Sequence, residues 1–351
     1  MSASDGSAAA DSRRVVVVGG GVIGIAAAHY LTRAGWRVTL IEKGAIGQGT
    51  SAGNCGLVCP SHVLPLAEPG AVGRTLKALV QKNSPFVIRP RLDPKLWSWL
   101  IRFALRCNQR DMLAAAKGIQ PLLESSLKLF HELVERDGLR CEWERKGLLF
   151  VYKSREELDA YAATNQLLSE SFHCPAHKLE GRALLDLEPA LKEELAGGWY
   201  YDDDAHLRPD VLLRSWKQSL LDQGATIHEG WTLRKFERQD GRAVAVVADQ
   251  GELTAESFVV ATGAVTPLLQ EHLGCRVPIQ PGKGYSLTMP RPAVCPKIPL
   301  IFPETRVAVT PFQSGYRLGS TMEFAGYDPS LRPERLGLLR QGARPYLREP
   351  D

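Results

Sequence analysis

A glycine-rich turn between an apolar run and a helical segment is the first place in the chain where chemistry is expected. Val15–Val18 is a run of four β-branched residues, which predicts a buried parallel strand. The segment GGGVIG (19–24) follows directly. Gly19 permits a tight turn, Gly21 lets a pyrophosphate approach the backbone, and Gly24 lets the next helix pack closely on the strand. This spacing predicts a dinucleotide-binding turn.

The elements around this turn supply the remaining contacts to a dinucleotide. A helix over 22–33 would direct its free N–H groups and its positive end at the phosphates. A second strand over 37–41 ends at Glu42, which is followed by Lys43 and stands 18 residues after Gly24. A carboxylate at this position accepts hydrogen bonds from the ribose hydroxyls and repels a 2′-phosphate.

Two further segments favour a flavin over a nicotinamide. GQGTSAGNCG (47–56) is a small, polar loop suited to a phosphate or a flavin ring, and SFVVATG (257–263) is a strand that ends in small residues. A chain that returns to the dinucleotide from such distant positions is typical of flavoproteins. The cofactor-binding residues expected from these segments are Gly19, Gly21, Val22, Ile23, Gly24, Glu42, Lys43, Thr50, Ser51, Asn54, Gly56, Leu57, Ala261, Thr262 and Gly263.

Composition excludes several other classes of protein. The 351 residues are 44% apolar and 23% charged, as in a globular protein of one large or two ordinary domains. The net charge of +4 is too small for a nucleic-acid footprint. Seven cysteines without a CxxC pair argue against a disulfide framework or a metal site and favour a reducing compartment, so we expect a cytoplasmic protein. Residues 1–12 lack the apolar core of a secretion signal.

At this point the sequence resembles a known family, the FAD-dependent D-amino-acid oxidase superfamily, and most closely its bacterial D-amino-acid dehydrogenase branch. The segments that carry the resemblance are VVVVGGGVIG (15–24), IEKG (41–44), GTSAGNCGLVCPSH (49–62), HLRPD (206–210), FVVATGA (258–264), PGKGYSLT (281–288) and YRLGSTMEFAGYD (316–328).

The resemblance implies an α/β fold in which a Rossmann-like FAD-binding domain is interleaved with an α+β substrate domain. The expected parts are 1–90 and 201–277 for the FAD domain, and 91–200 and 278–351 for the substrate domain. The cofactor is expected to be non-covalent FAD. The expected partners are an amino-acid substrate and an electron acceptor, which is a quinone, an electron-transfer chain or oxygen.

The activity implied by the resemblance is oxidation of the CH–NH bond of a D-amino acid, followed by hydrolysis of the imine to a keto acid. Tyr285, which follows Gly282 and Gly284, is the first candidate to bind the substrate carboxylate, with a packed tyrosine as the alternative. Arg306 and Arg317 are expected on paired strands and could offer a guanidinium to the same carboxylate. His62 follows the flavin-side loop and is a candidate neighbour of the flavin ring.

Three alternatives stay open at this point. The chain could oxidise sarcosine or glycine-type amines with the same fold and cofactor. Family members continue past this chain's end at Glu349-Pro350-Asp351, so we expect a truncated form, which could be a non-catalytic flavin-binding remnant or a subunit. The helical segment 92–107 is expected to pack on the core, with peripheral contact to the inner face of the cytoplasmic membrane as the alternative.

Overall fold

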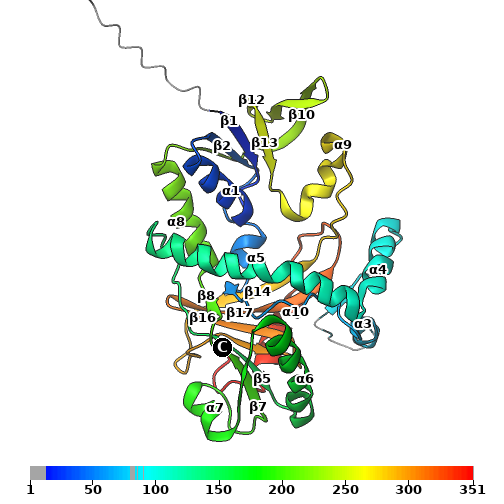
Figure 1. Ribbon diagram of the computed structural model, residues 1–351, viewed down its shortest axis with the longest axis vertical. Helices are drawn as coiled ribbons and strands as arrows, with labels where there is room; N and C mark the ends of the chain where they lie inside the picture. The colour runs from blue at the N-terminus through cyan, green and yellow to red at the C-terminus, as the bar shows by residue number, and fades with distance from the viewer. Residues whose placement is uncertain (1–12, 80–83, 85, 90, 351) are drawn as a thin grey trace, which may run out of the picture. The chain divides into compact units, whose positions relative to one another are not determined.

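The computed structural model describes residues 13–79, 84, 86–89 and 91–350, and the segment 1–12 lies outside this part (Figure 1). The chain divides into two compact units, each built from two separate stretches of sequence. The first unit holds the residues up to Ala52 together with Leu213–Ile279, and the second holds Gly53–Leu212 together with the residues from Gln280 on. Residues 53–90 therefore belong to the second unit, whereas the division expected from the sequence kept them with the FAD domain.

The first unit contains a four-stranded parallel sheet in the order β13 (Ser257–Val260), β1 (Arg14–Val18), β2 (Arg37–Glu42) and β9 (Thr226–Glu229). The four valines of β1 are buried, as expected for a strand flanked on both sides. Helix α1 (Val22–Arg33) follows β1 and packs on β1 and β2. This strand–turn–helix unit places the glycine-rich turn at the carboxyl end of the central strand.

A small antiparallel sheet completes the first unit: β10 (Leu233–Gln239), β11 (Arg242–Ala248) and β12 (Gly251–Thr254). Asp240 and Gly241, between β10 and β11, both have positive φ angles (49° and 77°), as a tight two-residue hairpin requires. The remaining helical segments are α2 (Thr50–Gly53) at the boundary of the units, and η1 (Gly263–Leu269) and α9 (Gln270–Leu273).

The second unit is built on an eight-stranded mixed sheet. Its strands lie in the order β14 (Lys283–Met289), β17 (Gly315–Phe324), β16 (Val307–Phe312), β15 (Leu300–Phe302), β5 (Leu148–Tyr152), β7 (Gly197–Tyr201) and β6 (His177–Leu179), with β4 (Phe86–Ile88) parallel to β17. Apolar residues of the central strands, such as Leu149, Leu300 and Val309, are fully buried and form the core. A two-stranded ribbon joins β3 (Leu57–Val58) to β8 (Ala205–His206).

The helices of the second unit are α3 (Ala71–Leu79), α4 (Pro94–Arg106), α5 (Gln109–Glu135), α6 (Arg155–Phe172), α7 (Gly181–Leu187) and α10 (Pro333–Ala343), while α8 (Pro209–Asp222) crosses the boundary. Helix α6 begins after Ser154, whose Oγ accepts a hydrogen bond from Glu157 N at 3.4 Å and so caps the helix. Helix α5 continues through Pro121 without a break. No described helix combines the length and apolar character needed to cross a membrane.

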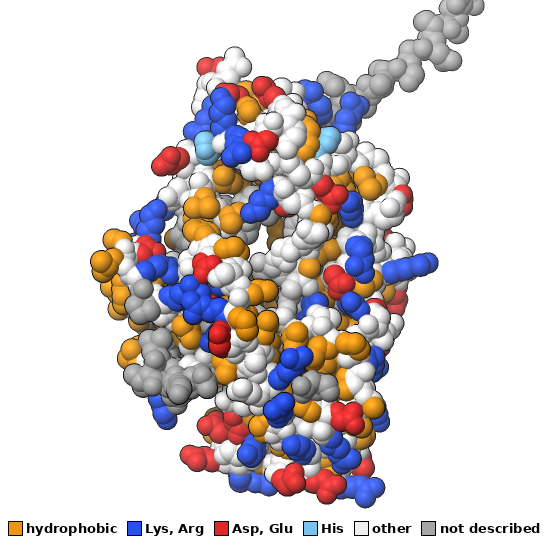
Figure 2. All heavy atoms as spheres, turned by 180° about the vertical axis from the view of Figure 1, so that it is seen from behind, with side chains coloured by type: hydrophobic (Ala, Val, Ile, Leu, Met, Phe, Trp, Pro, Cys, Tyr) orange, Lys and Arg blue, Asp and Glu red, His pale blue; other side chains and the backbone are white. Residues whose placement is uncertain are grey.

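Helix α4 packs on the core as expected through one face, and its other face is exposed and apolar. Its inner face packs, with Leu96 fully buried and the ring of Trp99 stacked on Phe103 at 5.3 Å. Its outer face exposes Trp97 (51%), Ile101 (60%) and Leu105 (72%). These three residues are four positions apart and form one apolar stripe. Figure 2 shows apolar side chains gathered at the edge where α3 and α4 lie.

Candidate active site

The glycine-rich turn of the first unit is too tightly packed to accept side chains. Gly19 has a φ angle of +110°, and a Cβ atom there would lie 2.5 Å from the carbonyl oxygen of Ala261. A Cβ atom on Gly24 would lie 1.8 Å from the carbonyl oxygen of Gly19. Gly21 is less confined, because its nearest neighbour would be Ser51 Oγ at 3.2 Å. The turn thus presents bare backbone, as close approach of a pyrophosphate requires.

The start of α1 suits an anion. Its first turn carries no acidic side chain, and its N-cap residue, Gly21, has no side chain that could cap the free N–H groups. Val22 N donates to Ser51 Oγ at 3.0 Å, which ties α2 to the first turn of α1. Ile23 is 69% exposed, so the surface next to this turn is open. The positive end of the helix is therefore not neutralised by a carboxylate of its own.

Glu42 is held by the backbone on both sides of its carboxylate. Its Oε2 accepts from Gly20 N at 2.7 Å, and its Oε1 accepts from Gly44 N at 2.9 Å. Each carboxylate oxygen can accept further hydrogen bonds, so ribose hydroxyls can still be bound. The structure thus brings Glu42, the glycine turn, Ser51 and Ala261 together, while Lys43 and Thr50 lie close by in sequence with exposed side chains.

Asn54, Gly56 and Leu57 belong to the second unit, where their loop is fixed on several sides. Asn54 Oδ1 accepts from Gly56 N at 2.7 Å, and Thr310 Oγ1 donates to the carbonyl oxygen of Cys55 at 2.7 Å. Gly56 has a φ angle of +70°, and a Cβ atom there would lie 1.9 Å from the carbonyl oxygen of Leu207. The loop is therefore as restricted in shape as the turn at Gly19.

Arg317 anchors the same loop from strand β17. Its side chain is 6% exposed, its guanidinium donates to the carbonyl oxygen of Asn54, and its Nε donates to Thr288 Oγ1 at 2.9 Å. Burial lowers the pKa of Arg317, with partial compensation from nearby Cys55 and Asp210. The guanidinium is thus committed to protein groups.

Arg306 differs from its expected position. It does not lie on a strand, since β16 begins at Val307, and its side chain is exposed in the turn after β15. Its φ angle of +54° is incompatible with an extended strand and explains why the strand starts one residue later. Arg306 and Arg317 therefore do not stand opposite one another on paired strands.

Tyr285 lies on β14 as expected, and its hydroxyl is used within the protein. The residue is 2% exposed, and its hydroxyl donates to Glu323 Oε2 at 2.7 Å. Burial raises the pKa of Tyr285, and the hydrogen bond to Glu323 adds to that effect. Glu323, 1% exposed, also accepts from Arg89 and lies 3.3 Å from Lys283 Nζ. Burial alone would raise the pKa of Glu323, but these partners outweigh it and hold the value at about 2.

Positive charge exceeds negative charge around Glu323. We define the Glu323 cluster as Arg89, Lys283, Tyr285, Glu323 and Arg332. Arg332 lies 3.9 Å from Glu323 and is about half exposed. One carboxylate here faces three cationic side chains, although Arg89 also pairs with the carboxylate of Asp328 at 2.7 Å. Arg89, Lys283 and Arg332 come from three distant segments of the sequence, so no local pattern specifies that they meet at Glu323.

His62 lies in an exposed position after β3. Its ring centroid is 5.7 Å from that of Phe150, and its backbone N–H donates to the carbonyl oxygen of Cys59 at 3.1 Å. The turn from Cys59 to His62 is therefore tight.

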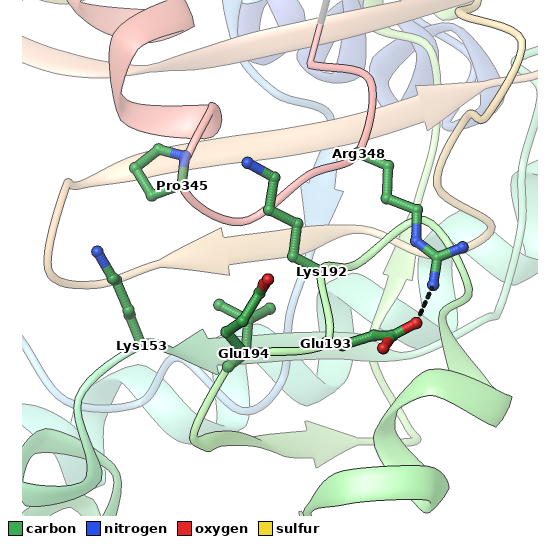
Figure 3. Close-up of a pocket in the computed structure, with 7 residues that line it drawn as sticks. Lys153, Lys192, Glu193, Glu194, Pro345 and Arg348 are labelled. Atoms are coloured by element: carbon green, nitrogen blue, oxygen red, sulfur yellow. Dashed lines mark ion pairs between the residues drawn. The ribbon is translucent and has the colours of Figure 1, made fainter.

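A separate hollow of about 510 Å³ lies elsewhere on the second unit (Figure 3). Both acidic and basic side chains line it, and two of them, Arg348 and Glu193, form an ion pair at 3.5 Å. Lys192 Nζ, which also lines it, donates to the carbonyl oxygen of Arg344 at 2.8 Å. None of the described residues expected to bind cofactor or substrate lines this hollow.

Comparison with known proteins agrees with these features. The chain matches the family model of the FAD-dependent oxidoreductases, DAO, over residues 14–351. It is 32% identical to a D-amino acid dehydrogenase of Xanthobacter autotrophicus over 93% of this chain and 79% of that relative. It is 33% identical to a D-amino acid dehydrogenase of Methylobacterium nodulans over 94% of this chain and 80% of that relative. The chain thus spans about four fifths of the length of these relatives.

Solved structures share the fold at lower sequence identity. Glycine oxidase from Geobacillus kaustophilus superposes with a TM-score of 0.70 at 22% identity, over 96% of this chain and 79% of its own. L-proline dehydrogenase from P. horikoshii gives a TM-score of 0.65 at 18% identity, over 96% and 79%.

The Rossmann-type turn on a parallel sheet and the carboxylate at the end of β2 are features of a dinucleotide-binding protein. The chain belongs to the FAD-dependent oxidoreductase family, DAO, and its cofactor is FAD.

We expect Gly24→Ala to abolish FAD retention, because the new methyl group would overlap the carbonyl oxygen of Gly19 and force β1 and α1 apart. The flavin-to-protein absorbance ratio of the purified chain measures this. Gly118→Ala is the control, since a Cβ atom there meets nothing within 4 Å. Full flavin content in Gly24→Ala would contradict the packing argument.

We expect Tyr285→Phe to lower the free energy of unfolding by about 1–3 kcal/mol, since the buried Glu323 carboxylate loses a hydrogen bond. Urea unfolding at neutral pH measures the change, with Tyr327→Phe, at an exposed position, as the control. A change equal to that of the control would count against the expected role of this bond.

The contribution of Glu323 to stability should depend on pH. Its pKa in the folded chain, about 2, is below the value of about 4.3 in an unfolded chain. The stabilisation is therefore complete well above pH 4.3 and is lost as the pH falls towards 2.

Proposed function

We propose that this protein oxidises D-amino acids to the corresponding imino acids, which hydrolyse to keto acids and ammonia. The observation that carries the proposal is the 32–33% identity to two D-amino acid dehydrogenases over about four fifths of their length. Oxidation of glycine-type amines is the competing function, and the glycine oxidase structures support it only through a shared fold.

The first unit's part in this reaction is to hold the cofactor. Bound FAD supplies the two-electron acceptor for the hydride that leaves the substrate Cα. The backbone of the turn at Gly19–Gly24 and the first turn of α1 would bind the pyrophosphate, and Glu42 would bind the ribose hydroxyls. Ser51 and Ala261 hold that turn in shape. Lys43, Thr50, Thr262 and Gly263 remain proposed contacts.

The second unit would bind the substrate. The excess positive charge of the Glu323 cluster suits a carboxylate, and Lys283 and Arg332 are the cations we propose to attract it. Tyr285 already donates to Glu323, so we propose that it contacts substrate as an acceptor or orients Glu323. The carboxylate of Glu323, held ionised, could accept a hydrogen bond from the substrate amine.

Arg317 and His62 take different roles in this proposal. Arg317 is a positioning residue, because its guanidinium holds the loop at Asn54. His62 remains a proposed neighbour of the flavin ring, together with Asn54, Gly56 and Leu57. Arg306 remains a proposed site residue that no observed contact favours.

We further propose that the electron acceptor is a quinone-type acceptor reached at a membrane surface. The exposed stripe Trp97, Ile101 and Leu105 on α4 supports this proposal, together with Arg102 and Arg106 on the same helix. An amphipathic helix with aromatic and basic residues is typical of proteins that lie on a bilayer surface.

The substrate and the acceptor can be tested in one assay. We expect turnover of D-amino acids with a soluble quinone as acceptor, and little oxygen consumption with the same substrates. The matching L-amino acids, glycine and sarcosine serve as comparison substrates. Turnover of sarcosine or glycine without turnover of any D-amino acid would overturn the proposal in favour of the amine oxidase.

Membrane contact can be tested by flotation with vesicles that contain anionic lipid. The protein should float with the vesicles, and Ile101→Gln together with Leu105→Gln should reduce the floated fraction several-fold, since two apolar side chains no longer insert. Leu268→Gln, at another exposed apolar position, is the control. Equal flotation of all three proteins would argue against contact through α4.

A further inference from the structure

Three side chains of different chemistry converge beside the ribbon of β3 and β8. Cys59 Sγ, a ring nitrogen of His62 and a carboxylate oxygen of Asp204 all lie within 4.8 Å of one another. Cys59 and Asp204 are buried, and His62 is exposed. The three residues lie in the second unit.

The backbone explains why these residues meet. In the antiparallel ribbon Leu57 pairs with His206 and Val58 with Ala205, so the next pair in register is Cys59 and Asp204. The tight turn that follows, closed by the hydrogen bond from His62 N to the carbonyl oxygen of Cys59, brings His62 back to the same point. The convergence therefore follows from strand register and one turn.

Ser61 orients the carboxylate within this group. Its backbone N–H donates to Asp204 Oδ1 at 3.2 Å, and its hydroxyl donates to Asp204 Oδ2 at 2.6 Å. Ligating carboxylates in metal sites are usually held by such outer hydrogen bonds. The neighbouring ring of Phe150 limits the positions open to His62.

We propose that Cys59, His62 and Asp204 form a binding site for one Zn²⁺ ion. A sulfur, an imidazole nitrogen and a carboxylate oxygen are a donor set that zinc binds tetrahedrally, with bonds of about 2.0–2.3 Å. Such bonds place ligand atoms about 3.5 Å apart, so a small rotation of the exposed His62 side chain closes the site. Binding releases the thiol proton of Cys59 to solvent and leaves the fourth position for water.

Zinc content and zinc coordination test this proposal in the full chain with FAD bound and without an affinity tag. The protein is dialysed against a chelator, given one equivalent of Zn²⁺, desalted and assayed by elemental analysis. We expect about one zinc per chain. X-ray absorption at the zinc edge should show one sulfur at about 2.3 Å and lighter atoms at about 2.0–2.2 Å.

Variants separate this site from adventitious binding. Cys59→Ser and His62→Ala should each lose the retained zinc, and Ser61→Ala should weaken binding about 10- to 100-fold. Because His62 is exposed, its replacement should leave the fold intact, which circular dichroism checks. Cys275→Ser is the control, since this exposed thiol would attract adventitious metal.

The proposal is overturned if the unmodified chain retains no more zinc than His62→Ala, or if the bound zinc has no sulfur neighbour. It is equally overturned if Cys275→Ser removes the metal and Cys59→Ser does not.

Discussion

The approach of Gly24 to the carbonyl oxygen of Gly19 is the contact on which the first unit depends. At this point the end of β1 and the first turn of α1 are so close that a Cβ atom would lie only 1.8 Å from that oxygen. The contact fixes where the helix starts and which way its N–H groups point. Glu42 then takes its place because its carboxylate caps the backbone of Gly20 in the same turn. One steric constraint therefore shapes both the phosphate end and the ribose end of the cofactor site that we propose.

In the second unit the main constraint is the burial of charged side chains. Glu323 is almost fully buried, and it is stable there because Arg89, Lys283 and Tyr285 all direct hydrogen atoms or positive charge at it. Arg317 is buried for a similar reason, with its guanidinium bonded to the backbone of the loop at Asn54. Backbone atoms thus form most of the cofactor site that we propose, whereas paired side-chain charges form the site that we propose for the substrate.

The parts of the fold that could be predicted are those specified by neighbouring residues. The β1–turn–α1 unit, the start of α6 at Ser154 and the hairpin at Asp240 and Gly241 each follow from a short pattern with a steric or hydrogen-bonding cause. Helix α10 was not foreseen, because two glycines interrupt its apolar spacing. Pro121 lies inside α5, so the disfavoured proline position does not mark the end of that helix.

The parts of the candidate site that depend on local backbone conformation could be predicted from the sequence. The contacts that depend on which strands pair, and in which register, could not. Tyr285 was placed on the right strand, yet its partner Glu323 follows from the register of β14 with β17, which no local pattern specifies. The proximity of Cys59 to Asp204 also follows from strand register, here that of β3 with β8. It was missed because the sequence was searched for pairs of cysteines only. The prediction that Arg306 lies on a strand was wrong for a local reason. Its positive φ angle places it in the turn that precedes the strand.

The measurement that tests the central claim most directly is the absorbance of the bound flavin after anaerobic addition of one enantiomer of an amino acid. This measurement needs no electron acceptor and therefore reports only the first half of the reaction. The account predicts that a D-amino acid bleaches the flavin bands and that its L enantiomer leaves them unchanged. Bands that persist with every D-amino acid, in a chain that retains FAD, would contradict it.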